Sequence, residues 1–213
     1  MTEYHQKITI DGTPAYLWDY DGWQMIPGNM DQQEPRYILA HSLKALLSQF
    51  RMKRNNGTPN EFHQSVVIAI QQMRRCLLNR TLRSCVYDSE VNPEEYQPVN
   101  GIGSVFLRAS IYYVYIADWL EVFPRDQFLI IRAEDYFNNR SGILADVYEF
   151  LGLQHVDPEL FRINNKSVVN RGIRSNMVML RKTRIMLTDF FKPFNIKLAE
   201  LLRDKKFMWN ARV

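Results

Sequence analysis

The sequence predicts an α/β domain in which a central parallel sheet is flanked by helices. The first observation is Phe128–Ile131, a continuous apolar run of strand length, which is typical of a parallel strand covered on both faces. The second is the order of elements, because apolar residues at helical spacing precede this run and follow it. The third is size. The 213 residues, 46% hydrophobic and 23% charged, suit a single domain over residues 1–213 and exclude a disordered or collagen-like chain.

The N-terminal part begins with a predicted strand. Lys7–Ile10 is a short β-prone run that ends at the turn signal Asp11-Gly12-Thr13-Pro14. Residues 16–35 combine tryptophans with Gly, Pro, Asp and Asn, so we expect an irregular loop with aromatic anchors. Pro35 then opens a predicted helix that ends near Gln49 and has its apolar positions at Leu39, Leu43, Leu46 and Leu47.

A capping box marks the start of the next helix, after a basic turn at 51–57. Thr58 is the predicted N-cap, Pro59 takes the first helical position, and Glu61 lies three residues after the cap. We expect this helix to end near Cys76. Its buried stripe comprises apolar residues at helical spacing, namely Phe62, Val66, Ile70, Met73 and Leu77.

Further helices and one basic loop complete the chain. Residues 104–123 form a predicted helix that Pro124 closes, and residues 141–151 form another that ends at Gly152. Residues 162–175 are a basic loop, and Pro193 is expected to separate two last helices, at about 177–191 and 194–203. The stripe of the 104–123 helix comprises Leu107, Ile111, Tyr115, Trp119 and Leu120.

Composition narrows the functional classes. The net charge of +4 and the pI of about 9.0 suit anionic partners, but no recognised motif indicates a nucleic-acid-binding module. No apolar run approaches the roughly 18 residues that span a bilayer, and residues 1–10 lack the apolar core of a signal peptide. The 4 histidines are isolated, which disfavours a metal site, and there is no GxSxG elbow of a serine hydrolase.

The cysteines and the glycosylation sequons provide information on the cellular compartment in which the chain folds. The 2 cysteines, Cys76 and Cys85, either close a short loop or are placed by chance, and spacing alone leaves both alternatives open. Sequons are compatible with passage through a secretory lumen, and the chain has them at Asn56, Asn79, Asn139 and Asn165.

A family resemblance rests on five segments that span nearly the whole chain. They are residues 8–16 (ITIDGTPAY), 76–85 (CLLNRTLRSC), 111–120 (IYYVYIADWL), 128–135 (FLIIRAED) and 190–198 (FFKPFNIKL). Together and in this order they resemble the carbohydrate sulfotransferases, especially the N-acetylgalactosamine 4-sulfate 6-O-sulfotransferase group of the chondroitin and dermatan sulfate pathway. The resemblance implies a P-loop-like sulfotransferase fold.

The resemblance also implies a reaction and a place for it. A sulfuryl group passes from 3′-phosphoadenosine 5′-phosphosulfate (PAPS) to a hydroxyl of a sulfated glycosaminoglycan acceptor, and no metal is needed. The enzyme would act in the Golgi lumen, with a full-length form that is a type II membrane protein. This segment itself would contact neither membrane nor nucleic acid.

Site residues follow from the family's motifs. An acid before the Thr-Pro-Ala-Tyr turn is the candidate base, here Asp11, although Gly12 replaces the lysine that often follows it. The late basic loop implies a cofactor-binding role for Lys166, Arg171 and Arg174, and a solvated surface loop is the alternative. The Glu134-Asp135 step is expected to orient neighbouring loops, and Tyr112 and Trp119 are expected to pack in the core. The resemblance makes Cys76–Cys85 a disulfide.

Two donor-binding parts of the family pattern are not found. One is the 5′-phosphosulfate loop, which would precede Asp11. The other is a strand and loop of the Arg-(Asp/Asn)-Pro-x-x-Arg-x-x-Ser type that grips the 3′-phosphate, expected between Gln49 and Thr58. The sequence therefore predicts an incomplete domain, truncated on its N-terminal side and with an apparent internal deletion near 49–57. The alternative function is an inactive family member that binds sulfated glycans or a protein partner.

Overall fold

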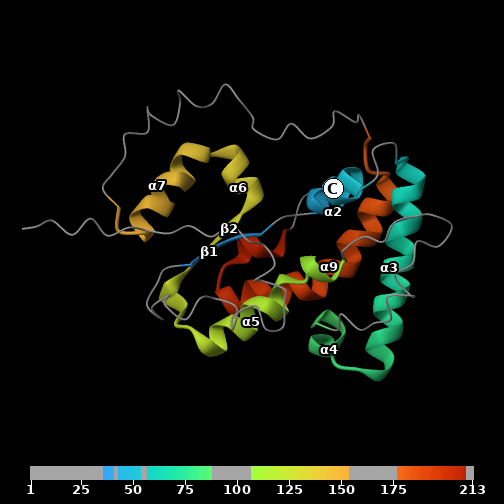
Figure 1. Ribbon diagram of the computed structural model, residues 1–213, viewed down its shortest axis with the longest axis horizontal. Helices are drawn as coiled ribbons and strands as arrows, with labels where there is room; N and C mark the ends of the chain where they lie inside the picture. Colours follow the sequence, from blue (N-terminus) through green and yellow to red (C-terminus); the bar gives the residue numbers. More distant parts are fainter. Residues whose placement is uncertain (1–35, 41–42, 54–56, 88–106, 154–176, 210–213) are drawn as a thin grey trace, which may run out of the picture.

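The computed structural model describes residues 36–40, 43–53, 57–87, 107–153 and 177–209 (Figure 1). The elements, with η marking 3₁₀ helices, are β1 (Arg36–Ala40), α2 (Leu43–Lys53), α3 (Pro59–Asn79), α4 (Leu82–Tyr87), η1 (Arg108–Ser110), α5 (Tyr112–Val122), η2 (Arg125–Gln127), β2 (Phe128–Arg132), α6 (Ala133–Asn138), α7 (Arg140–Phe150), α9 (Arg181–Leu202) and η4 (Lys205–Met208).

β1 and β2 form a parallel pair. Arg36 lies opposite Phe128 and Ala40 opposite Arg132. Three of the five residues of β2, Phe128, Ile130 and Ile131, are buried, as expected for a strand that is covered on both faces. Helices follow β1, and helices both precede and follow β2, so the described part has the α/β class that the sequence predicts.

β1 corrects the prediction of a helix that opens at Pro35. Residues 36–40 form a strand, and the helix begins at Leu43 and runs to Lys53. The prediction used the spacing of Leu39 and Leu43, which suits one face of a helix. Pairing with β2 outweighs that local signal, and Tyr37 and Ile38 are residues that favour strands.

α3 begins as predicted. The Thr58 hydroxyl accepts from the Glu61 amide at 3.2 Å, and the Glu61 carboxylate accepts from the Thr58 amide at 2.7 Å, which completes the capping box. The helix continues to Asn79, about one turn beyond Cys76. The predicted stripe is buried at Phe62, Val66, Ile70 and Met73, and Leu77 is half-buried at its edge.

α9 corrects the prediction of two helices separated by Pro193. It is one helix from Arg181 to Leu202 with the proline inside. A proline in a helix interior costs about 3 kcal/mol, because it removes a backbone hydrogen bond and crowds the preceding turn. Buried residues on both sides of the proline offset this cost, including Phe190 and Leu198.

Among the described residues, two clusters of buried side chains make up the core, and α9 contributes to both. The helical core joins α2, α3, α4 and α5 to the first half of α9 around Leu46, Phe62, Tyr115 and Leu187. The sheet core joins β2, the second half of α9 and η4, and it includes Phe128, Ile130, Leu198, Leu202 and Phe207. Tyr112 is buried in this cluster and Trp119 packs against it, so the prediction of core packing for both is confirmed.

Candidate functional site

The predicted reaction residues lie outside the described part of the chain. Asp11 belongs to residues 1–35, and Lys166, Arg171 and Arg174 belong to residues 154–176. Their roles as base and as cofactor-binding residues stay predictions. The candidate site described below therefore consists of the residues around the ends of β1 and β2, which belong to the described part of the chain.

The carboxyl ends of β1 and β2 meet at one edge of the sheet, because the strands are parallel and Ala40 lies opposite Arg132. α2 begins at Leu43, shortly after β1, and α6 begins at Ala133, directly after β2. Open α/β sheets bind their ligands at this edge. We therefore take it as the candidate site.

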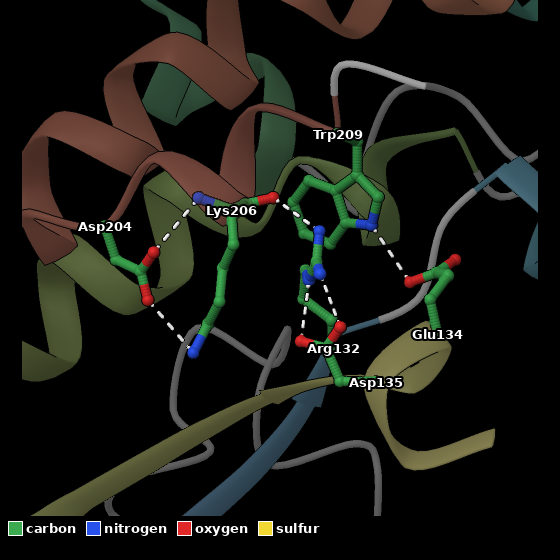
Figure 2. Close-up of polar contacts among 6 residues, drawn as sticks. All are labelled: Arg132, Glu134, Asp135, Asp204, Lys206 and Trp209. Carbon is green, nitrogen blue, oxygen red and sulfur yellow. Dashed lines mark hydrogen bonds and ion pairs between the residues drawn. The ribbon is translucent and has the colours of Figure 1, made fainter. Parts of the chain in front are cut away.

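Arg132, the last residue of β2, is at the centre of a polar network at this edge (Figure 2). Its Nε donates to Asp135 Oδ2 at 2.8 Å and its Nη2 donates to Asp135 Oδ1, so the ion pair is bidentate. Its Nη1 donates to the backbone carbonyl of Lys206 at 2.8 Å. One guanidinium thus joins the end of β2 to α6 and to η4.

The C-terminal segment adds three further contacts, and we call Asp204–Trp209 the C-terminal latch. The indole Nε1 of Trp209 donates to Glu134 Oε2 at 3.0 Å. Lys206 Nζ pairs with Asp204 Oδ2 at 2.9 Å, and the Lys206 amide donates to Asp204 Oδ1 at 3.0 Å (Figure 2). The latch therefore holds the first turn of α6 from the far end of the described chain.

These contacts confirm the predicted role of the Glu134-Asp135 step, since each carboxylate accepts hydrogen bonds that orient a neighbouring segment. The sequence analysis missed Arg132 and Trp209. The position of Arg132 at the end of an apolar strand is a signal that could have identified it. No sequence signal connects Trp209 to Glu134, 75 residues earlier.

In this network the pKa values of Arg132 and Asp204 are both shifted towards the charged form of the side chain. Hydrogen bonding to Asp135 raises the pKa of Arg132, and burial opposes this only in part. Burial acts to raise the pKa of Asp204, but hydrogen bonds from Lys206 and the charges of Lys206 and Arg132 together lower it. Because Asp135 holds the Arg132 guanidinium at two nitrogens, an anionic ligand would have to displace this carboxylate to use the same donors.

A cavity of about 40 Å³ lies beside this edge, between α2, α5, α9 and the latch. Its lining is mostly apolar and comprises Leu43, Leu46, Ser110, Tyr112, Phe191, Asn195 and Trp209. A space of this size holds roughly three water molecules and is far too small for a nucleotide. The cavity neighbours the candidate site and is not itself a donor pocket.

The disulfide that the resemblance implies is confirmed. Cys76 of α3 and Cys85 of α4 are bonded, with their Cα atoms 5.9 Å apart. Within the loop, Arg83 Nε donates to both carboxylate oxygens of Asp118 on α5, at 3.1 and 2.9 Å. Burial raises the pKa of Tyr87, and its hydrogen bond to Asp118 adds to this effect. The disulfide and the ion pair together attach α4 to α3 and α5.

Two of the four sequons fall on described residues. Asn79 is exposed at the last position of α3. Asn139 is exposed too, but its Oδ1 caps α7 by accepting from the Gly142 amide at 3.1 Å. Asn56 and Asn165 lie outside the described residues. Glycosylation stays a prediction at all four positions.

Within the described ranges no group of three or more His, Cys, Asp and Glu side chains is arranged to hold a metal ion. None of the helices in the described ranges is long and apolar enough to cross a membrane.

The described strand and helix that could carry the 3′-phosphate motif lie earlier in the chain than the sequence predicts. The sequence analysis expected its strand between Gln49 and Thr58, but residues 49–53 are the end of α2 and residues 54–56 lie outside the described part. A strand followed by a helix lies earlier, at β1 and α2. Aligned with the end of β1, the motif has its serine at Ser48, but Ala40, Ser42 and Ala45 stand at its Arg, Pro and second Arg positions. The deletion near 49–57 stays a prediction.

Comparison with known proteins decides the family. No family model matches the chain. Human carbohydrate sulfotransferase 15 is 28% identical over 226 residues, which cover 96% of this chain and 39% of the human protein. Carbohydrate sulfotransferase 15 of Nototodarus sloanii is 32% identical over 147 residues, which cover 65% of this chain and 85% of that protein. The chain belongs to the carbohydrate sulfotransferase family.

The family match has a limited extent. The chain spans about two fifths of the length of the mammalian relatives, 39% for the human protein and 40% for the rat protein. Among solved structures, a sulfotransferase from Alicyclobacillus acidocaldarius is 17% identical with a TM-score of 0.47, covering 80% of this chain and 55% of that one.

Proposed function

We propose that this carbohydrate sulfotransferase family member transfers a sulfuryl group from PAPS to a hydroxyl of a sulfated glycosaminoglycan sugar. The observation that carries the proposal is the match to proteins named carbohydrate sulfotransferase 15, which covers 96% of this chain for the human protein. The parallel strand pair supports it, because its carboxyl edge is where α/β sheets bind nucleotides.

In the proposed reaction Asp11 is the general base. Its carboxylate takes the proton of the acceptor hydroxyl while the hydroxyl oxygen attacks the sulfur. The bond between sulfur and the bridging phosphate oxygen breaks, and 3′-phosphoadenosine 5′-phosphate leaves with the electron pair. Lys166, Arg171 and Arg174 stabilise the charge on the transferring and leaving oxygens.

The described framework supplies rigidity to this site. Arg132 and the latch fix the first turn after β2, so groups that line the carboxyl edge keep their spacing. We place the reaction in the Golgi lumen, in a full-length form with a membrane anchor. The Cys76–Cys85 disulfide supports an oxidising compartment.

The test is Asp11→Asn. If Asp11 is the base, we expect sulfate transfer to chondroitin sulfate to fall by about 100-fold or more, since general bases contribute factors of this size. Affinity for 3′-phosphoadenosine 5′-phosphate, measured by isothermal titration, should stay within about twofold, because the carboxylate acts on the acceptor and not on the nucleotide. Asp19→Asn, a nearby acid, is the matched control. Equal activity of Asp11→Asn and the wild type would reject the role.

A specific observation favours a second candidate, an inactive member that binds sulfated glycans or a protein partner. Ala40 and Ala45 stand where the aligned 3′-phosphate motif has arginines, and alanine cannot bind a phosphate through its side chain. If titration of the purified chain with 3′-phosphoadenosine 5′-phosphate shows no binding, the enzyme proposal fails for this chain. The second candidate then stands.

A further inference from the structure

We infer that, in a secretory lumen, Asn79 carries an N-linked glycan and Asn139 does not. The sequon motif marks both asparagines alike, and the structure separates them by what each carboxamide does in the fold. The inference shares with the proposed function only the passage through a lumen, which the Cys76–Cys85 disulfide supports independently. It needs no sulfate transfer by this chain.

Asn79 belongs to a segment that is exposed at every position. Residues 78–81 are all exposed, and the side chain of Leu78, directly before Asn79, is 82% exposed. No hydrogen bond joins the Asn79 side chain to another described residue. A glycan is bulky and needs solvent around the nitrogen to which it is attached. The carboxamide of Asn79 has this space.

The turn that carries Asn79 is held by other groups. The Arg80 amide donates to the carbonyl of Cys76 at 3.0 Å, and the disulfide closes the turn. The Thr81 hydroxyl accepts from the Ser84 amide at 3.2 Å, in the first turn of α4. A glycan on the Asn79 nitrogen therefore leaves the contacts that shape this turn in place.

The Asn139 carboxamide, in contrast, is part of the fold. Its Oδ1 accepts from the Gly142 amide at 3.1 Å and caps α7. A Cβ added to Gly142 would overlap Asn139 Nδ2, so this nitrogen lies directly against the first turn of the helix. A side-chain cap satisfies a backbone amide that the helix leaves without a partner. A sugar on Asn139 Nδ2 would displace the carboxamide from the cap.

The co-reactant is a polyprenyl pyrophosphate that carries an oligosaccharide, and a lumenal oligosaccharyltransferase catalyses the step. Asn79 Nδ2 forms a bond to the anomeric carbon of the first sugar, while the bond from that carbon to the pyrophosphate oxygen breaks. The polyprenyl pyrophosphate leaves with the electron pair, and Nδ2 gives up one of its two protons. Thr81 supplies the hydroxyl that the sequon requires.

The glycan would lie away from the candidate site. Figure 1 shows α4 and the adjoining end of α3 on the opposite side of α5 and α9 from α6 and α7, which follow β2. A glycan at Asn79 therefore extends from the α3–α4 end of the molecule. The carboxyl edge of the sheet stays open.

The test measures glycan occupancy at each asparagine. A cleavable signal peptide directs the 213-residue chain into the endoplasmic reticulum of cultured eukaryotic cells. Peptide N-glycosidase in water labelled with heavy oxygen converts each glycosylated asparagine into a labelled aspartate, and peptide mass spectrometry reads each position. We expect label at Asn79 and none at Asn139. No label at Asn79, or occupancy of Asn139 equal to that of Asn79, overturns the inference.

Matched variants check the assignment by electrophoresis before and after deglycosylation. Asn79→Gln should lose one glycan, whereas Asn139→Gln should keep the same number of glycans as the wild type. Thr81→Ser keeps a hydroxyl in the sequon and should retain the glycan. A shift in Asn139→Gln, or none in Asn79→Gln, contradicts the inference.

Gly142→Ala tests the cause of the difference. The new Cβ would force the Asn139 carboxamide out of the cap, so we expect the variant to gain a glycan at Asn139. Gly152→Ala is the matched control, because it strains a glycine with φ of 64° just beyond α7 but its Cβ meets no atom within 4 Å. The control should leave Asn139 unmodified. Unchanged Asn139 in Gly142→Ala, or a gain in both variants, overturns the role of the cap.

Nucleotide titration keeps this inference distinct from the proposed reaction. Asn79→Gln should leave the affinity for 3′-phosphoadenosine 5′-phosphate unchanged, because the glycan lies away from the sheet edge. A chain that is glycosylated at Asn79 but binds no nucleotide contradicts the proposed reaction and supports this inference. A chain that transfers sulfate without a glycan at Asn79 supports the reaction and overturns this inference.

Discussion

The helical core and the sheet edge are held together in different ways. Around the helical core, the capping box and the disulfide join residues that are near in sequence, Thr58 with Glu61 and Cys76 with Cys85, 9 residues apart, and the His63–Thr183 contact joins residues 120 apart. At the sheet edge Arg132 pairs locally with Asp135, but the hydrogen bonds that attach the C-terminal latch are long-range, since Trp209 contacts Glu134 across 75 residues. Local links lose little chain entropy when they form, whereas long-range links require most of the fold. The helical core also has the disulfide and the larger cluster of buried side chains, so it should be the more stable region, and the latch should open first.

The largest expected effect is in the helical core. Phe62 has no exposed surface and packs edge-on against Phe50, with ring centroids 5.3 Å apart. Phe62→Ala should lower the free energy of unfolding by about 3–5 kcal/mol, because it removes buried area and leaves a cavity. Urea denaturation measures this. Phe137→Ala, at a side chain that is 68% exposed, is the control and should change stability by less than about 0.5 kcal/mol. Similar losses for both would contradict the burial pattern.

The second-largest expected loss of stability comes from removing the disulfide. Replacing Cys76 and Cys85 together with alanine should cost about 2–3 kcal/mol, since the short closed loop restricts the unfolded chain. The measurement is denaturation of wild type and variant, with and without a reducing agent. Reductant should destabilise only the wild type. A variant as stable as the oxidised wild type would show that the bond does not contribute.

The latch should give smaller and more local effects. Arg132→Met removes the bidentate pair with Asp135 and the bond to the Lys206 carbonyl, at an expected cost of about 2 kcal/mol. Trp209→Phe removes only the indole donor to Glu134 and should cost about 1 kcal/mol. Hydrogen exchange should show faster opening of η4 in both variants and unchanged protection in α3. Equal acceleration in α3 would mean that the two regions open as one unit.

The smallest expected effect is a pH dependence at His63. Burial, and then the charge of Lys182, lower its pKa from 6.5, and its Nδ1 lies 2.9 Å from the Thr183 hydroxyl. The unfolded chain therefore binds the proton more readily, so stability is full above about pH 6.5 and falls as the pH drops towards the lower folded pKa. His63→Gln should show a shallower loss over this range in thermal midpoints. A parallel pH profile in both proteins would exclude His63 as the cause.

The same contrast explains how much of the fold could be predicted. The start of α3, its buried stripe and the cysteine pair were predictable, because each signal lies within a few residues of its partner or matches a family segment. The strand at Arg36–Ala40 was predicted as helix, since only pairing with β2 makes it a strand. The continuity of α9 through Pro193 was missed because buried contacts with other elements stabilise it.

The candidate site divides in a similar way. The Glu134-Asp135 step was correctly interpreted as structural, from its place after an apolar strand and from the family pattern. Its partners could not be predicted, because Trp209 and the Lys206 carbonyl come from a distant segment. The roles of Asp11 and of the late basic loop depend on the resemblance, and the Asp11→Asn experiment tests the first of them.

The latch also has a consequence for how the protein is made. The ribosome synthesises β2 and α6 long before Lys206 and Trp209. The hydrogen bonds of Arg132 and Glu134 to the C-terminal latch can form only after those two residues have been made. During that interval the end of β2 lacks its C-terminal partners, and the helical core is completed only when the first half of α9 has also been made. Premature termination a few codons before Trp209 would therefore leave a product with intact helices and a loose ligand-facing edge.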